Sequence, residues 1–226
     1  MSKEIEYFHV PTATQKAIQR DGRIAIWVMR LFCKLDLPDG IRLHDGRPVL
    51  ACGNHQSLLD VFCAAAFCAS TGVSCRFLVQ ARYFKNPILG RWLRRIGCIP
   101  LNSKTKRSAF VEARAALERG ELVGIMPEGR LTPPSERTPQ VGPARPGAAE
   151  LAGSVNAWMR PICFHNTGTV WPRDKWPRPR LRRPTVTLRL GDAHFESTDD
   201  AQADIDQVMA ALTDMLTELD TRLEGS

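Results

Sequence analysis

Residues 48–60 read Pro-Val-Leu-Ala-Cys-Gly-Asn-His-Gln-Ser-Leu-Leu-Asp, an apolar run that leads into a histidine and, five positions later, a carboxylate. On one continuous helix the side chains of His55 and Asp60 would lie about 140° apart and could not meet. A strand that ends near Cys52, a loop that carries His55 and a helix that starts at Ser57 would bring Asp60 back under the imidazole. Asp60 would then hold Nδ1 of His55 and leave Nε2 to take a proton, as in a general base with its orienting partner.

The same residues allow a second interpretation. Ser57 and Asp60 have the spacing of a capping box, in which Asp60 bonds back to the start of the helix and His55 is an ordinary loop residue. The substitution Asp60→Asn separates the two, because under the capping interpretation it lowers stability and leaves activity intact.

Apolar runs alternate with segments of helical periodicity, which predicts an α/β fold with a single mixed sheet flanked by helices. We expect strands at residues 48–52, 74–79, 97–101, 122–126, 159–164 and 185–190. Helices are expected after Ser57, over 87–96, over 109–119, from about Pro146, and from Thr198 onward. Ser108 would be an N-cap and Gly120 would follow the end of the same helix.

The length of 226 residues allows one sizeable core, and no repeat or linker divides the chain. We predict one domain with an N-terminal helical or interfacial segment (1–47), a catalytic α/β core (48–195) and a C-terminal amphipathic helix (196–226). That helix would pack on the core or, alternatively, form a partner interface.

The chain has seven cysteines, an odd number, mostly within apolar runs and without Cys-x2-Cys spacing. This favours a reducing compartment and no structural zinc, and no pair among the five histidines has the spacing of a helical zinc site. The first residues lack the pattern of a secretory signal. We therefore expect a cytoplasmic protein that needs no metal or cofactor.

No apolar stretch approaches the roughly 20 residues of a membrane-spanning helix. Residues 24–35 would instead form either a helix in the lipid headgroup region, with Arg30 and Lys34 snorkelling outward, or a helix that packs on the sheet.

The net charge is +7, and the densest basic run, 173–183, follows Trp171. This run fits an anionic membrane surface, an acidic carrier protein, the phosphates of coenzyme A or a solvated loop. Nucleic acid is not an expected partner, because no nucleic-acid-binding module is present.

Three further segments follow the histidine motif. They are an apolar strand after a glycine at 97–102 with a connecting segment at 81–90, a strand that runs into Pro-Glu-Gly-Arg at 122–130, and a proline-containing strand at 158–163. With Asn54, His55 and Asp60, they make the chain resemble the glycerolipid acyltransferase superfamily, which esterifies lysophosphatidic acid (1-acylglycerol-3-phosphate) and related lysolipids. The resemblance spans roughly residues 49–192.

The chain departs from the family pattern at two points. Arg130 follows Gly129 directly, which resembles the acyltransferase domains that act on lysophosphatidylethanolamine. Asn102 and its successor replace the family's arginine after the second strand, and the nearest cations there are Lys104, Lys106 and Arg107. Either these cations or Arg130 would bind the acceptor phosphate, or the acceptor has no phosphate in the usual place.

The resemblance implies a transfer of a fatty acyl group from acyl-coenzyme A or acyl carrier protein to a lysophospholipid hydroxyl, without an acyl-enzyme. His55 would be the general base, with Asn54 and Gly129 at the substrate. Glu128 would orient Arg130 or the acceptor hydroxyl, or simply form a turn-stabilising salt bridge. A backbone N–H group of the Pro127–Gly129 turn would stabilise the tetrahedral oxyanion.

Residues 131–146 are proline-rich and lack periodicity, which predicts a surface loop. The loop would close over the acceptor as a lid, or serve only as a connection. At its end, Arg145 and a helix N-terminus would form an anion pocket.

Two alternatives remain from different classes. One is an acyltransferase of the same fold that acts on a phosphate-free acceptor, such as an amino lipid or a specialised metabolite. The other is a lipid-binding module without catalysis, against which the intact pair His55 and Asp60 argues.

Overall fold

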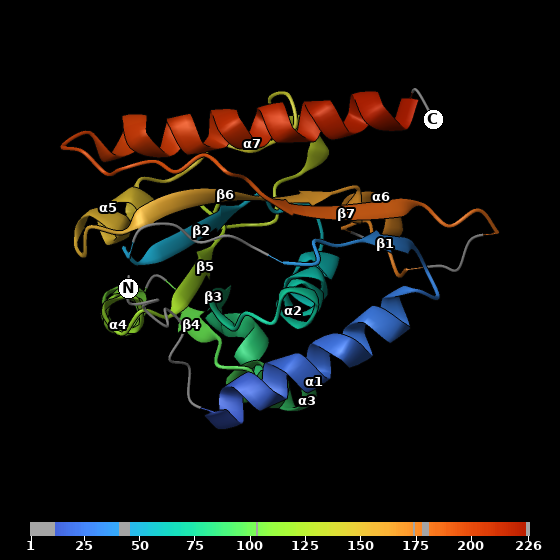
Figure 1. Cartoon of the computed structure of the whole chain (residues 1–226), viewed down its shortest axis with the longest axis horizontal. Helices are drawn as coiled ribbons and strands as arrows, with labels where there is room; N and C mark the ends of the chain where they lie inside the picture. Colours follow the sequence, from blue (N-terminus) through green and yellow to red (C-terminus); the bar gives the residue numbers. More distant parts are fainter. Residues whose placement is uncertain (1–11, 41–45, 103, 174, 178–180, 225–226) are drawn as a thin grey trace, which may run out of the picture.

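The computed structural model describes the chain except for residues 1–11, 41–45, 103, 174, 178–180 and 225–226. Its described part contains one seven-stranded sheet of order β1-β7-β6-β2-β5-β3-β4 (Figure 1). The strands are β1 (Lys34–Asp36), β2 (Val49–Gly53), β3 (Cys75–Gln80), β4 (Ile99–Leu101), β5 (Leu122–Ile125), β6 (Trp158–His165) and β7 (Thr185–Leu190). Only β6 and β7 pair antiparallel. The predicted α/β fold with a mixed sheet is confirmed.

The α-helices are α1 (Thr12–Met29), α2 (Leu59–Thr71), α3 (Pro87–Arg95), α4 (Lys106–Glu118), α5 (Gly147–Gly153), α6 (Thr167–Val170) and α7 (Ala201–Glu224). Two short 3-10 helices, η1 (Ala81–Lys85) and η2 (Pro134–Glu136), lie in the connections. The start of α3 follows from its sequence, because Asn86 caps it by accepting from the backbone N–H groups of Ile88 and Leu89 and Pro87 fits the first turn.

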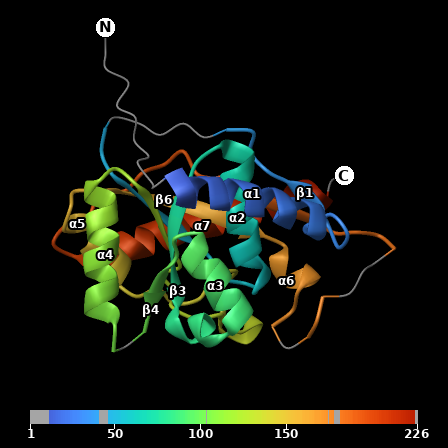
Figure 2. The ribbon, with the colours of Figure 1, turned by 90° about the horizontal axis from the view of Figure 1, so that it is seen from below.

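The sheet is buried on both faces. In β2, Val49 and Ala51 point into one hydrophobic core, while Leu50 and Cys52 point into the other. Helices α1, α2 and α3 cover the first face, and α4, α5 and α7 cover the second (Figures 1 and 2). This explains why the central strands β2 and β5 are continuous apolar runs rather than alternating ones.

The direction of the strands decides where the functional segments meet. Strands β2, β3, β5 and β6 run parallel to one another, so their carboxyl ends lie at the same edge of the sheet. The loop with His55 follows β2, the turn with Glu128 follows β5, and η1 follows β3. Ligands of open α/β sheets bind at this edge.

The structure corrects the expectation for residues 24–35. Helix α1 ends at Met29, and β1 begins at Lys34, where it pairs parallel with β7. The edge strand β1 is held in addition by Arg189, whose guanidinium reaches both carboxylate oxygens of Asp36 at 2.7 Å. The segment before residue 48 is therefore part of the sheet as well as helical.

Helix α4 begins earlier than expected. It starts at Lys106, because the side chain of Asn102 accepts from the backbone N–H groups of Lys104 and Thr105 and turns the chain there. Ser108, the expected N-cap, lies inside the helix and donates to the carbonyl of Thr105. The end is as expected: Gly120 has φ of 77° and follows the last turn.

The C-terminal helix predicted from periodicity is α7. It buries Ile205, Val208, Met209, Leu212 and Leu216 against β6 and α5. Among the described helices, none is long and apolar enough to cross a membrane.

Candidate active site

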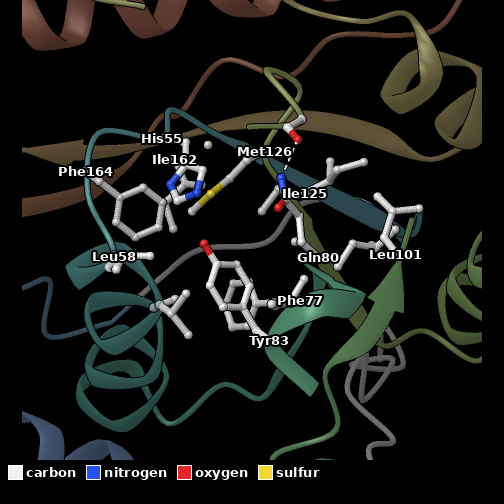
Figure 3. A pocket seen from close by; sticks show the side chains of 18 residues that line it. His55, Leu58, Phe77, Gln80, Tyr83, Leu101, Ile125, Met126, Ile162 and Phe164 are labelled. Atoms are coloured by element: carbon white, nitrogen blue, oxygen red, sulfur yellow. Dashed lines mark hydrogen bonds between the residues drawn. The ribbon is translucent and has the colours of Figure 1, made fainter. Parts of the chain in front are cut away.

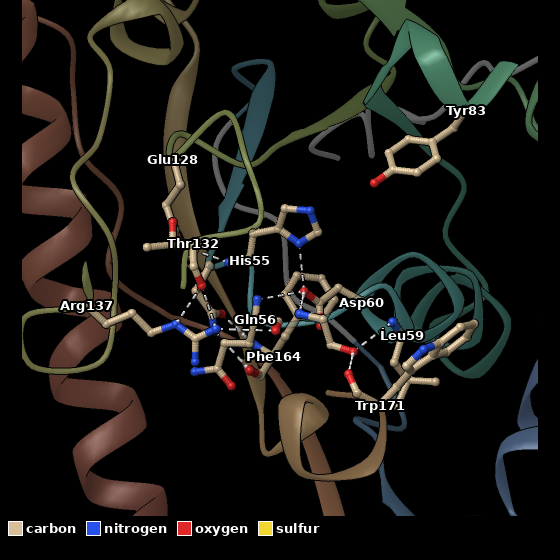
Figure 4. A network of polar contacts seen from close by, with 12 residues as sticks. His55, Gln56, Leu59, Asp60, Tyr83, Glu128, Thr132, Arg137, Phe164 and Trp171 are labelled. Carbon is tan, nitrogen blue, oxygen red and sulfur yellow. Dashed lines mark hydrogen bonds and ion pairs between the residues drawn. The ribbon is translucent and has the colours of Figure 1, made fainter. Parts of the chain in front are cut away.

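The His55 loop makes the bend that its sequence requires. Strand β2 ends at Gly53 and α2 begins at Leu59, so Asp60 returns beneath the imidazole. Asp60 Oδ2 lies 2.8 Å from His55 Nδ1 (Figure 4). The same oxygen accepts from the backbone N–H groups of Gln56 and Ser57, each at 2.9 Å. The two sequence interpretations thus hold together, because one carboxylate both caps the loop and holds the imidazole.

Asp60 is fully buried, whereas the His55 side chain is 13% exposed. With Nδ1 bound to the carboxylate, Nε2 is left to face the open space (Figure 4). No described residue hydrogen bonds to Nε2. An imidazole oriented in this way can take a proton from a ligand.

Asn54 fixes the loop to the neighbouring strand. Its side-chain oxygen accepts from the N–H of Phe164 at 2.8 Å, and its Nδ2 donates to the carbonyl of Phe164 at 3.0 Å. The side chain is fully buried and its amide is occupied on both sides. Asn54 therefore has a structural contact in place of the substrate contact expected from the sequence.

Glu128 braces the same loop from β5. Its Oε1 accepts from the backbone N–H of His55 at 2.8 Å, and the residue is 3% exposed (Figure 4). It does not orient Arg130, as the sequence suggested. The side chain of Arg130 is half exposed and pairs with Glu136 of η2. Arg130 lines neither the cavity in front of His55 nor the cationic cavity described below.

An apolar cavity of about 80 Å³ opens in front of His55 (Figure 3). Its walls come from the ends of β2, β3, β5 and β6 and from α2. Leu58, Phe77, Met126, Ile162 and Phe164 supply most of the labelled apolar side chains. The hydroxyl of Tyr83, from η1, points toward His55 across this space (Figures 3 and 4).

A second cavity of about 550 Å³ adjoins the first. The two share Gln80, Leu101, Ile125, Met126 and Gly129. The second cavity is bordered by three cations, Arg82, Lys106 and Arg145. The side chain of Arg145 lies against Gly129, whose φ is 66° and whose missing Cβ would stand 3.5 Å from the arginine Cδ. An apolar cavity and a cationic one thus meet at Gly129.

Of the other predicted cations, Lys104 and Arg107 line neither of these cavities. They border a separate cleft between α4 and Glu150. Lys106 borders both this cleft and the cationic cavity, with its ammonium 5.4 Å from the centre of the Phe110 ring and 3.9 Å from Glu150 Oε2. Of the cations that the sequence proposed for the substrate, Arg145 borders a cavity next to His55, whereas Lys104 and Arg107 lie apart from it.

The proline-rich loop 131–146 is packed rather than poised as a lid. Its Val141 joins α7 in a hydrophobic cluster, and Arg137 donates to the carbonyls of Thr132 and Gln56 (Figure 4). Up to residue 144, the loop contributes nothing to the wall of the His55 cavity. Its contact with the His55 loop is the hydrogen bond from Arg137 to the carbonyl of Gln56.

The backbone donor expected for the oxyanion is also placed differently. The N–H of Gly129 donates to the carbonyl of Met126 at 2.9 Å, and Pro127 has no N–H.

Sequence reasoning missed Tyr83, Gln80 and Arg82. Gln80 is the last residue of β3, whose carboxyl end reaches the site. Arg82 and Tyr83 lie in the connecting segment 81–90, which the family resemblance included without giving these two residues a role.

Among the described residues, no three His, Cys, Asp or Glu side chains gather in a way that could hold a metal ion.

A histidine held by a buried carboxylate lies at the carboxyl edge of the parallel strands, in front of an apolar cavity. This is the geometry of a candidate enzyme site in an α/β fold. A family model described as Acyltransferase matches residues 37–165, more than half of the sequence. The chain belongs to this family and is an acyltransferase-family enzyme. The family resemblance drawn from the four sequence segments is confirmed.

The fold is similar to the crystal structure of the 1-acyl-sn-glycerophosphate (LPA) acyltransferase PlsC from Thermotoga maritima, with a TM-score of 0.71. The two sequences are 20% identical, and the match covers 91% of this chain and 79% of that one. A comparison with curated proteins found no match.

Proposed function

We propose that the enzyme transfers a fatty acyl group from an acyl-coenzyme A or acyl carrier protein thioester to a hydroxyl of a lysophospholipid similar to 1-acylglycerol-3-phosphate. The observation that carries this proposal is the 2.8 Å contact between Asp60 Oδ2 and His55 Nδ1 in front of an apolar cavity that adjoins a cationic one. An amphiphilic substrate with a hydrocarbon chain and a phosphate matches this pair of cavities.

His55 acts as general base. Its Nε2 takes the proton of the acceptor hydroxyl while the acceptor oxygen attacks the thioester carbonyl carbon. The buried carboxylate of Asp60 stabilises the imidazolium that forms. Collapse of the tetrahedral intermediate restores the C=O bond, and the leaving thiolate takes the proton back from Nε2. No acyl-enzyme is needed.

The acceptor phosphate binds in the cationic cavity, with Arg145 as its principal partner. No described residue pairs with the guanidinium of Arg145, whereas Arg130 is occupied by Glu136. An unpaired arginine can bind phosphate with two parallel hydrogen bonds. Lys106, which lies 3.9 Å from Glu150, is a further cation at the border of this cavity. Of the cations that the sequence offered for the acceptor phosphate, we therefore favour Arg145 over Arg130.

The enzyme works at an anionic lipid surface on the cytoplasmic side, bound peripherally. Helix α1 and the turn after it leave Ile24, Trp27, Val28 and Leu31 between 40% and 68% exposed, although Ala25 and Met29 on the same helix are buried. Arg20, Arg23 and Arg30 lie exposed among them. Apolar side chains that include tryptophan, ringed by arginines, suit the interface of an anionic bilayer.

The test is an acyl-transfer panel with detection of products by mass spectrometry. Purified enzyme is incubated with acyl-coenzyme A or acyl carrier protein against lysophosphatidic acid, lysophosphatidylethanolamine and phosphate-free alcohols and amines, with His55→Ala in parallel. We expect acylated lysophospholipid from the wild type and none from the variant. Transfer to phosphate-free acceptors alone would refute the proposed substrate class, and no transfer with any pair would refute the enzymatic proposal.

A further inference from the structure

The oxyanion of the proposed reaction needs a hydrogen-bond donor that the Pro-Glu-Gly turn does not provide to the cavity. A preorganised donor at this oxygen is one of the largest contributions to acyl-transfer catalysis. In the turn, Pro127 has no N–H, the N–H of Gly129 is bonded to Met126, and Glu128 does not line the cavity. The donor has to come from another wall.

The wall opposite His55 carries such a group. Helix η1 follows β3 directly, and its residue Tyr83 borders the cavity with the hydroxyl directed at the imidazole (Figure 3). The second close-up shows the same orientation from another side (Figure 4). A carbonyl group located between His55 and Tyr83 would have the base on one side and a phenol on the other.

Arg82 prepares this hydroxyl to be a donor. The guanidinium of Arg82 donates to the Tyr83 oxygen at 3.0 Å and lies 4.9 Å from the centre of the ring. A phenol has one proton to give, and an incoming hydrogen bond occupies a lone pair of its oxygen. The proton is therefore directed away from Arg82, and no described residue accepts it. A charged donor on the oxygen also strengthens the hydrogen bond that the hydroxyl gives.

We infer that Tyr83 is a catalytic residue that donates a hydrogen bond to the thioester carbonyl oxygen and, more strongly, to the oxyanion that forms from it. The inference rests on the proposed acyl transfer. As the acceptor oxygen bonds to the carbonyl carbon, the π electrons of the C=O bond move to oxygen and Tyr83 holds the resulting charge. The phenol keeps its proton throughout, because the acceptor proton travels to His55 and then to the leaving thiolate.

Two substitutions separate the hydroxyl from the ring. Tyr83→Phe removes only the hydroxyl, and Tyr83→Leu removes the ring as well. We expect Tyr83→Phe to lower kcat about 100-fold with KM nearly unchanged, which is the usual effect of losing one oxyanion donor. Tyr83→Leu should be no more active. Melting temperatures of both variants check that the fold is kept.

A second measurement detects the hydrogen bond itself. With a dithioester donor, in which sulfur replaces the carbonyl oxygen and accepts hydrogen bonds poorly, wild type and Tyr83→Phe should react at similar rates. A purely structural role of Tyr83 would slow both donors by the same factor. If Tyr83→Phe does not fold, Arg82→Met removes the group that orients the Tyr83 hydroxyl while Tyr83 stays in place. This variant should also lower kcat.

Three results would overturn the inference: wild-type kcat in Tyr83→Phe, an equal loss with thioester and dithioester, or wild-type kcat in Arg82→Met. A wild-type enzyme that transfers no acyl group would instead refute the proposed function. Because the wild type and His55→Ala are measured in the same series, the two failures are distinguishable.

Discussion

At the scale of single residues, Asp60 links folding to chemistry. Its Oδ2 receives hydrogen bonds from the His55 ring and from two backbone N–H groups, whereas Oδ1 is buried without a described partner. Removing the carboxylate should therefore affect both the conformation of the loop and the orientation of the imidazole. Glu128 also orients His55, but indirectly. It accepts a hydrogen bond from the backbone N–H of His55 and lines neither cavity.

Gly142 tests this outer support. A Cβ at Gly142 would stand 2.6 Å from Glu128 Oε2 and 2.4 Å from Thr132 Oγ1, so a Gly142→Ala substitution must displace these side chains. Since Glu128 holds His55, we expect kcat to fall about 10- to 100-fold although the cavity is untouched. Steady-state kinetics measure the effect.

Gly40→Ala is the matched control, because a Cβ there would meet nothing within 4 Å. It should keep wild-type kcat and melting temperature. Full activity in Gly142→Ala would show that the position of Glu128 does not matter for His55.

At the scale of elements, α1 combines two faces with different roles. Its buried face packs against α2, and its outer face presents apolar side chains to solvent. The sequence left the interfacial and the core-facing interpretations of residues 24–35 open. The part that is helical, residues 24–29 of α1, has both exposed and buried apolar side chains. Periodicity alone could not decide between them, because both faces of α1 carry apolar residues.

The outer face predicts a loss of lipid binding that is separate from catalysis. We expect the double substitution Trp27→Ser and Leu31→Ser to weaken binding to vesicles containing phosphatidylglycerol about 10-fold or more, because two large apolar side chains no longer enter the interface. Co-sedimentation with vesicles measures the binding.

Val111→Ser is the control for this experiment. Val111 is 62% exposed but lies on α4, away from α1, so its loss should leave vesicle binding unchanged. Equal weakening by both changes would mean that general surface hydrophobicity, not the α1 surface, binds the lipid.

At the scale of the whole molecule, the sequence predicts the sheet well because most of its longer strands are short, mainly apolar segments, and β7 alternates between polar and apolar residues. The strand β1 escaped prediction because Lys34, Leu35 and Asp36 carry no pattern and depend on pairing with β7. The pairing of His55 with Asp60 was predictable because the two residues are only five positions apart, and a single bend between β2 and α2 brings them together. The sequence also placed Arg145 near the site, where it borders the cationic cavity. The position of Tyr83 across the cavity from His55 was not predictable, because it depends on distances between segments far apart in the chain.

The two-sided burial of the sheet has a consequence for the cysteines. All seven are free and buried, and burial raises the pKa of Cys33 to about 11 and of Cys52, Cys68, Cys98 and Cys163 to about 12. The thiols of the folded protein are therefore protonated and inaccessible at pH 8. An aromatic disulfide reagent should label almost none of them in the native enzyme and all seven in denaturant.

Raised folded-state pKa values also set a direction for stability. Above pH 9, the unfolded chain loses thiol protons that the folded chain keeps, so the free energy of unfolding should fall as the pH rises from about 9 toward 12. Denaturant titrations under reducing conditions measure it. Rapid labelling of the native enzyme, or stability that rises over this pH range, would contradict the burial of the cysteines.

The most direct test of the central claim is the kcat/KM for acyl transfer in His55→Ala, Asp60→Asn and the double variant. If Asp60 acts through His55, each single variant should lose activity by about 1,000-fold or more, and the double variant should be no worse than His55→Ala. Asp60→Asn should also unfold at a lower temperature, because the loop loses its charged acceptor. An Asp60→Asn enzyme that is less stable but fully active would contradict the account and reduce the carboxylate to a cap.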